Sequence, residues 1–195
     1  MTYSLPTSIT VGGINYEIRT DFRAILDILE ALADPSMSDY EKVSVMLEIF
    51  YFSPDYTEIP AEYIQEAVDK CAWFIDCGEE IPHDQKNKPK VMDWEQDFQY
   101  IVAPINKNIG CDIRGIPYDP ATNSGGLHWW TFISAYYEIG DCTFSQIVRI
   151  RSAKAKGRKL DKSDLEWYRQ NRHMVDFKNA FTDAENDVMK QWGVK

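Results

Sequence analysis

The chain has 195 residues, of which 44% are hydrophobic and 27% charged, the proportions of an ordinary soluble globular protein. Its 31 acidic and 21 basic side chains give a formal charge of -10, which repels nucleic-acid phosphates and anionic lipids unless basic groups cluster. No apolar run approaches the roughly 20 residues that span a bilayer, and the first residues lack the pattern of a signal peptide. We therefore expect a protein that remains in the cytoplasm where it is made.

The cysteines and histidines are scattered along the chain, without a C-x-x-C pair. Zinc sites bring their ligands in close pairs, because short loops or helical turns must present four donors tetrahedrally. The spacing here predicts plain thiols and no metal site or other cofactor. The residues are Cys71, Cys77, Cys111, Cys142, His83, His128 and His173.

The first 78 residues read as a β-hairpin followed by three helices. Residues 8–20 alternate apolar and polar around Gly12-Gly13, which is typical of a tight hairpin. Asp21 has the character of an N-cap, and Ser38-x-x-Glu41 forms a capping box. The three helices are expected over about 21–33, 38–52 and 60–76.

The composition of residues 79–92 differs from that of the preceding helices, because it is rich in Gly, Pro, Asn and charged residues. This composition predicts a linker or exposed loop before a helical lobe at 93–195. A helical period resumes at Asp93, and Pro104 should kink or shorten that helix. The predicted class is mostly α, a compact multi-helix domain with a small N-terminal β-hairpin, its two lobes forming one folded unit.

The rest of the second lobe is expected to be a long irregular loop over 110–126 and four helices. The first is an aromatic helix at 127–139, placed at the centre of the lobe. Thr143-x-x-Gln146 and Ser163-x-x-Glu166 match capping boxes and predict the next two helices. The last helix is expected from about 174 to 192.

The aromatic segment 127–137 holds two tryptophans, a phenylalanine and two tyrosines in eleven residues. Its apolar belt is wider than a surface helix needs, and the simplest interpretation is a helix in the core. We expect Leu127, Trp130 and Ile133 to be core residues. Because the helix has more apolar positions than one packing face uses, a second set is predicted to bind a partner, together with two arginines of the following helix. These candidates are Trp129, Tyr136, Tyr137, Arg149 and Arg151.

The usual catalytic signatures are missing from the sequence, including the nucleophile elbow and the phosphate-binding loop. Glu138 and Asp141 lie near aromatic residues, as the carboxylates of a glycosidase do. Acidic residues near a helix end are common, however, and aromatics at this spacing more often fill a core. Gly125-Gly126 could receive an anion, but a sharp turn into Leu127 is the simpler interpretation. We expect no enzymatic activity.

Seven cations within fourteen residues form a basic cluster against the acidic background. One interpretation is a solvated helix end followed by an exposed loop. A second is a dock for an acidic protein surface, and a third is a phosphate-binding patch, weakened by the acidic net charge and the lack of interleaved aromatics. The cluster contains Arg149, Arg151, Lys154, Lys156, Arg158, Lys159 and Lys162.

Parts of the second lobe resemble a known signature. It consists of Leu127-His128-Trp129-Trp130-x-Phe132, a short turn, Thr143-Phe144 and Ile147-Val148-x-Ile150-Arg151. This string is similar to that of a bacteriophage family whose genes lie beside those of the major tail and tape-measure proteins in long-tailed phages. Members of that family are regarded as tail assembly chaperones. The chain departs from the pattern in its Ile-Gly-Cys-Asp-Ile stretch at 109–113 and in a longer loop before Leu127.

The resemblance covers roughly residues 95 to 172 and implies a binding role without an active site or cofactor. Its expected partners are the phage tape measure protein and, as a second candidate, the major tail protein, in the host cell cytoplasm, with no membrane and no nucleic acid. The alternative hypothesis, from another functional class, is a small phage regulator or nucleic-acid-associated protein that uses the basic stretch 149–162.

Overall fold

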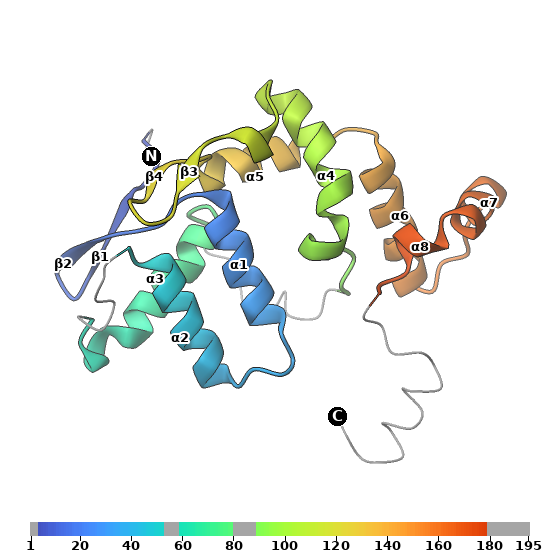
Figure 1. Ribbon diagram of the computed structural model, residues 1–195. Coiled ribbons are helices and arrows are strands. Elements are labelled where there is room, and N and C mark those ends of the chain that lie inside the picture. The colour runs from blue at the N-terminus through green and yellow to red at the C-terminus, as the bar shows by residue number, and fades with distance from the viewer. Residues whose placement is uncertain (1–3, 53–58, 80–88, 179–195) are drawn as a thin grey trace, which may run out of the picture. The chain divides into compact units, whose positions relative to one another are not determined.

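The computed structural model describes residues 4–52, 59–79 and 89–178 of the chain, which are mostly helical (Figure 1). Contacts divide the protein into two compact units. Unit 1 comprises residues 1–88 and 101–140, and unit 2 comprises residues 89–100 and 141–195. The predicted class, mostly α with a small N-terminal hairpin, is confirmed.

The N-terminal hairpin pairs β1 (Ser8–Val11) with β2 (Ile14–Glu17) in antiparallel register. Gly12 and Gly13 form the turn with φ of 56° and 82°, the left-handed region in which a glycine is least strained. The hairpin lies against helices through buried Ile9, Val11 and Tyr16. This covering is needed because two strands alone are only marginally stable.

Three helices follow the hairpin, and each begins close to its predicted position. They are α1 (Phe22–Ala33), α2 (Asp39–Phe50) and α3 (Ile64–Ile75), the last preceded by the 3-10 helix η2 (Ala61–Tyr63). Asp21 caps α1, and Ser38 forms the expected capping box with Glu41. The three helices bury a continuous set of apolar side chains that includes Ile25, Ile28, Leu47, Phe50, Ala67 and Phe74.

Helix α4 (Trp94–Ile109) contains Pro104 and continues for five residues beyond it. The expectation that this proline shortens the helix is therefore wrong. Ile101, Val102 and Ile105 are buried on the same helix, and this packing outweighs the hydrogen bond that the proline cannot make. The first part of α4, to Tyr100, belongs to unit 2, and the remainder belongs to unit 1.

Residues 110–126 are more regular than the predicted loop. They form the 3-10 helix η4 (Ile113–Gly115) and a two-residue ladder of β3 (Tyr118–Asp119) with β4 (Ser124–Gly125). The aromatic helix α5 (Trp129–Tyr137) follows.

The structure divides the chain differently from the predicted lobes at 1–78 and 93–195, because 101–140 belongs to unit 1 with the hairpin and α1 to α3.

Unit 2 contains α6 (Thr143–Ala155), α7 (Lys162–Gln170) and the short α8 (Arg172–Val175). Its buried apolar cluster is formed by Ile147, Ile150 and Val175, with Tyr100, Leu160, Trp167, Tyr168 and Met174 packed against it. In the described part of the chain, no helix is both long and apolar enough to cross a membrane.

Three predicted helix boundaries in unit 2 are wrong. Helix α6 is capped one residue earlier than expected, at Cys142, whose N–H donates to the Oγ of Ser145. Helix α7 is capped by Asp161 in place of Ser163. The chain leaves the helical conformation at Asp176, so no helix runs on from Met174 there; the predicted continuation from 179 to 192 lies outside the described residues.

Candidate partner-binding site

The start of α5 is fixed to the start of α1 by a buried carboxylate. Asp21 accepts from the N–H of Arg23 through Oδ1 and from the N–H of Leu127 through Oδ2, at 3.0 and 2.8 Å. Backbone bonds from Phe22 to Leu127 and from Trp129 to Thr20 flank this contact. Asp21 is 2% exposed, so these bonds replace the water that a carboxylate normally requires.

Gly126 has φ of +85° and lies directly against the Asp21 side chain. A Cβ at this position would overlap the Asp21 carboxylate. The sharp turn predicted from Gly125-Gly126 is therefore present, and Gly126 also makes room for the carboxylate that holds α5. The sequence pattern alone gave no sign of this second requirement.

His128 is the N-cap of α5. Its Nδ1 accepts from the N–H of Trp130 at 3.1 Å, and its Nε2 lies 3.0 Å from the carbonyl oxygen of Pro6. This pair of contacts assigns the proton to Nε2, because Nδ1 must carry the accepting lone pair. Burial lowers the pKa of His128, and the contact with the Pro6 carbonyl opposes that shift. The neutral ring is the form that fits the site.

The two tryptophans hold α5 against the end of α3. The indole N–H of Trp129 donates to the carbonyl of Ile75, and that of Trp130 donates to the carbonyl of Phe74, each at 2.8 Å. Trp129 is 2% exposed and its ring stacks on Phe132, whereas Trp130 is only half-buried. The expected order of burial is thus reversed. Trp129 is a core residue in this structure and does not lie on a surface.

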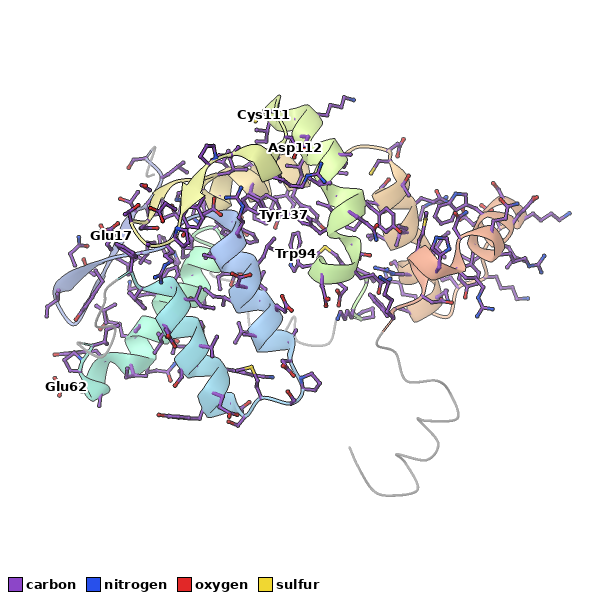
Figure 2. The ribbon with its side chains drawn as sticks, in the orientation of Figure 1. Glu17, Glu62, Trp94, Cys111, Asp112 and Tyr137 are labelled. Carbon is purple, nitrogen blue, oxygen red and sulfur yellow. The ribbon has the colours of Figure 1, made fainter. Side chains whose placement is uncertain are left out.

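The C-terminal end of α5 presents the two tyrosines. Tyr137, labelled in Figure 2, is 77% exposed. Tyr136 is half-buried, with its ring centroid 5.8 Å from that of Tyr137. The other large aromatic rings of this helix, Trp129, Trp130 and Phe132, are buried or half-buried. Of the candidates on α5, Tyr137 is therefore the one that the structure leaves open to a partner, with Tyr136 beside it.

The two arginine candidates of α6 have partners within unit 2. Arg149 binds both carboxylate oxygens of Asp164 and the Oε1 of Gln146, while its side chain stays 56% exposed. Such a bidentate pair restricts the guanidinium to one geometry. Arg149 therefore lies at the surface but is already neutralised by a neighbouring helix.

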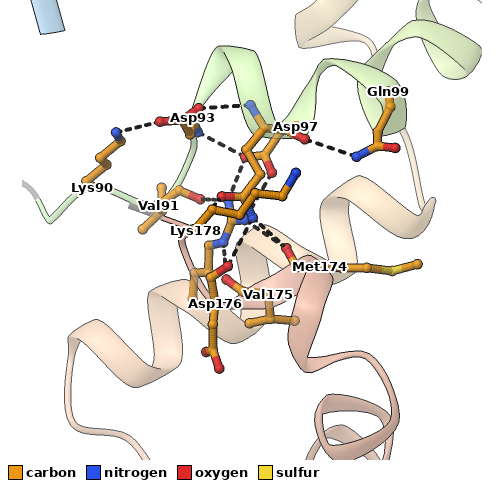
Figure 3. Close-up of polar contacts among 11 residues, drawn as sticks. Lys90, Val91, Asp93, Asp97, Gln99, Met174, Val175, Asp176 and Lys178 are labelled. Atoms are coloured by element: carbon orange, nitrogen blue, oxygen red, sulfur yellow. Dashed lines mark hydrogen bonds and ion pairs between the residues drawn. The ribbon is translucent and has the colours of Figure 1, made fainter. Parts of the chain in front are cut away.

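Arg151 is buried, with 3% of its side chain exposed, and forms an ion pair with the fully buried Asp97. Figure 3 labels Asp97, Met174 and Val175 around this contact. Its guanidinium also donates to the carbonyls of Val175 and Met174, at 2.6 and 2.9 Å. The ring of Phe177 lies 4.1 Å from the guanidinium carbon. Arg151 therefore joins α6, the start of α4 and the segment after α8, and this structure places it away from any surface.

An open cavity of about 690 Å³ in unit 1 was not predicted from the sequence. Three arginines line it, and all three have internal partners. Arg19 donates to the carbonyls of Glu48 and Ile49, Arg23 bonds to Asp21 and to the carbonyls of Ile113 and Ile116, and Arg114 pairs with Asp112. Asp27 and Glu48 lie in the same wall. This mixture of paired charges assigns no particular ligand to the cavity.

Within the described ranges, no group of three His, Cys, Asp or Glu side chains is placed to hold a metal ion. The described chain is a mostly α protein whose candidate site is the C-terminal end of α5, with exposed Tyr137 and half-buried Tyr136. The family model described as "Bacteriophage Gp15 protein" matches residues 1–177, and the chain belongs to this family. No curated protein and no solved structure matches the chain.

Proposed function

We propose that this phage protein is a non-enzymatic tail assembly chaperone that binds the tape measure protein in the host cytoplasm, with the major tail protein as a second candidate partner. The observation that carries the proposal is membership of a bacteriophage family, together with the Leu127–Arg151 signature quoted above. A chaperone for a long, apolar chain needs exposed apolar surface of its own and enough charge to stay dissolved. The net charge of -10 fits the second requirement.

The exposed end of α5 is the surface we propose for this partner. A tyrosine gives a large contact area for little loss of side-chain freedom, and aromatic residues are enriched among the residues that dominate binding. Tyr137 is fixed by a helix whose other rings are packed in unit 1, so it is presented rigidly. Helices of a tape measure chain are the kind of apolar surface that such a ring can bind.

The test is co-expression of the chain with the tape measure protein of the same phage, followed by co-purification and measurement of affinity. Replacing Tyr137 with Ala should weaken binding by about 30-fold, the effect of losing about 2 kcal/mol at an interface centre. Its free energy of unfolding should change by less than about 0.5 kcal/mol, because the side chain is largely exposed.

Tyr40 provides a matched control, since it is 81% exposed at the start of α2 and lies outside the signature. The change Tyr40→Ala should leave tape measure binding unchanged. If the unaltered chain does not hold the tape measure protein in solution, the proposed function is wrong. If it does, and Tyr137→Ala binds as well as the unaltered chain, only the proposed surface is wrong.

The alternative, a nucleic-acid-associated regulator, would use the basic stretch 149–162. In the structure, three of its seven cations are paired with carboxylates of unit 2: Arg149, Arg151 and Lys154. This pairing reduces the charge available to phosphates. A mobility shift with duplex and single-stranded DNA over a range of salt concentrations tests the alternative, because phosphate contacts weaken steeply as salt rises.

A further inference from the structure

Two turns between consecutive helices carry opposite charge, one in each unit. The basic turn is residues 156–162, from the end of α6 to the first residue of α7 in unit 2. The acidic corner is Glu30, Asp34, Asp39 and Glu41, at the end of α1 and the start of α2 in unit 1.

The basic turn is held in a fixed conformation at both ends. Gly157 has φ of +63° and its N–H donates to the carbonyl of Lys154, while the N–H of Arg158 reaches back to Ala153 at 2.9 Å. These bonds close the end of α6 in the manner of a Schellman motif. Asp161 then caps α7, and Leu160 packs on the apolar cluster of unit 2. The cations of the turn are therefore carried on an ordered backbone.

Four cationic side chains of this turn take no part in the ion pairs within unit 2. All four are exposed, and none forms an ion pair with any residue that the structure describes: Lys156, Arg158, Lys159 and Lys162. The one carboxylate in the turn, Asp161, accepts from the N–H of Asp164 as the cap of α7. The turn therefore has an uncompensated positive charge.

The acidic corner has the opposite imbalance. No Lys or Arg occurs from residue 24 to residue 41, and the last turn of α1 has no basic residue to offset the negative end of the helix. Hydrogen bonds from Ser36 and Ser38 lower the pKa of Asp34 and of Glu41, so both remain ionised at neutral pH. Lys42 is the nearest cation in sequence.

The same asymmetry extends over the whole chain. The excess of Asp and Glu lies in unit 1, whereas unit 2 has slightly more Lys and Arg than Asp and Glu. We propose that the basic turn of one molecule binds the acidic corner of a second copy, in a head-to-tail contact. Complementary patches on different faces of one chain give a heterologous interface. The inference is independent of the proposed function.

A protein partner fits the basic turn better than nucleic acid does. The turn contains no aromatic side chain for stacking on bases. Contacts between exposed charges are individually weak and are screened within about 10 Å at 0.1 M salt. The association should therefore be weak and strongly dependent on ionic strength.

Sedimentation of the full chain over a range of concentrations tests the proposal. At about 20 mM salt the average mass should rise above 22.6 kDa with concentration, and at about 0.3 M salt, where the screening length is well under 10 Å, it should return to that value. A mass that stays at the monomer value at low salt and high concentration would show that the proposal is wrong.

Charge reversal then identifies the two surfaces. One variant carries Lys156→Glu, Arg158→Glu and Lys159→Glu, and the other carries Glu30→Lys and Asp39→Lys, which spares the cap residues Asp34 and Glu41. Each variant alone should be monomeric, because the first has two acidic surfaces and the second has a corner without net charge for its basic turn to bind. Mixed together, they should associate again, since each supplies the charge that the other lacks.

The control for the first variant makes the same change in net charge elsewhere: Lys70→Glu, Lys107→Glu and Arg169→Glu, all at exposed positions. It should self-associate like the unaltered chain. If the mixed variants stay apart, or if the charge reversals alter only the shape of a monomer, the contact between copies does not exist. Loss of association after nuclease treatment would assign the basic turn to nucleic acid and overturn the proposal.

Discussion

The interiors of the two units of this protein are stabilised by different kinds of contact. Unit 1 packs aromatic rings in series, with Phe22 stacked on Phe132 and Phe132 stacked on Trp129. Unit 2 has a small apolar cluster and adds to it a buried ion pair, Arg151 with Asp97. The comparison teaches that a buried charged side chain can stabilise a fold as much as a buried aromatic ring does. Removing either one lowers the free energy of unfolding, because its buried partners lose their contacts.

The largest expected effect is in unit 2. The change Arg151→Ala removes one partner of a buried ion pair and leaves the Asp97 carboxylate without its counter-charge. Breaking such a pair from one side typically lowers the free energy of unfolding by about 3 to 5 kcal/mol. Urea denaturation followed by far-ultraviolet circular dichroism measures the loss.

The control replaces both partners, as Arg151→Met with Asp97→Leu. Apolar residues of similar volume often substitute for a buried ion pair at little net cost. The double variant should therefore be more stable than Arg151→Ala alone. Equal destabilisation of the two would mean that the bonds from Arg151 to the carbonyls of Val175 and Met174 matter more than its pairing with Asp97.

A smaller effect is expected in unit 1 from Trp129→Phe. This change keeps an aromatic ring but removes the N–H that binds the carbonyl of Ile75, and it leaves part of the indole volume empty. Together these losses should lower the free energy of unfolding by about 2 kcal/mol. Thermal or urea unfolding measures the difference.

Trp130→Phe is the matched comparison for that change, because Trp130 makes the same bond to the carbonyl of Phe74 from a half-buried position. Water can replace part of its lost hydrogen bond, so the cost should be smaller than for Trp129. A larger loss of unfolding free energy for Trp130→Phe would instead support the prediction from the sequence, in which Trp130 is the core residue.

The smallest expected effect is the pH dependence from His128. Burial lowers its pKa from the usual 6.5, so the unfolded chain binds a proton at higher pH than the folded one. The stabilisation from the neutral ring is complete above pH 6.5 and is lost as the pH falls through the lowered value. His128 is partly exposed, so the loss should be less than about 1 kcal/mol.

Melting temperatures at pH 7.5 and 5.5 test this, with His128→Asn as the control. Asn is a good N-cap residue and has no proton to gain in this range. The variant should lose less stability than the unaltered chain over that interval. An identical loss in both would assign the pH dependence to groups other than His128.

The sequence predicted the first half of the fold more accurately than the second, for physical reasons. Caps and tight turns are local, so Asp21, Ser38 and the Gly12-Gly13 pair could be recognised from a few neighbouring residues. In unit 2, both Asp161 and Ser163 are residue types that can cap the start of α7. The structure has Asp161 as the cap, and helix α7 then places Asp164 against Arg149.

The candidate site was predictable as a region but not residue by residue. Trp129 and Trp130 are adjacent, and which of them is buried depends on α3, more than fifty residues earlier in the chain. Arg151 follows the buried Ile147 at helical spacing, which indicates an inward position, but its partner Asp97 is 54 residues away. Of the candidates on α5, Tyr137 is exposed and Tyr136 beside it is half-buried, while Arg149 lies at the surface but is paired with Asp164.

The bond between Asp21 and the N–H of Leu127 has a consequence for synthesis on the ribosome. Its two partners are 106 residues apart in sequence. At translation rates of about 5 to 20 residues per second, α1 and the hairpin wait roughly 5 to 20 seconds for residue 127 to be made. Until then the Asp21 carboxylate remains hydrated, and Phe22 lacks the ring of Phe132. Unit 1 can therefore complete its core only late in synthesis, after most of the chain has left the ribosome.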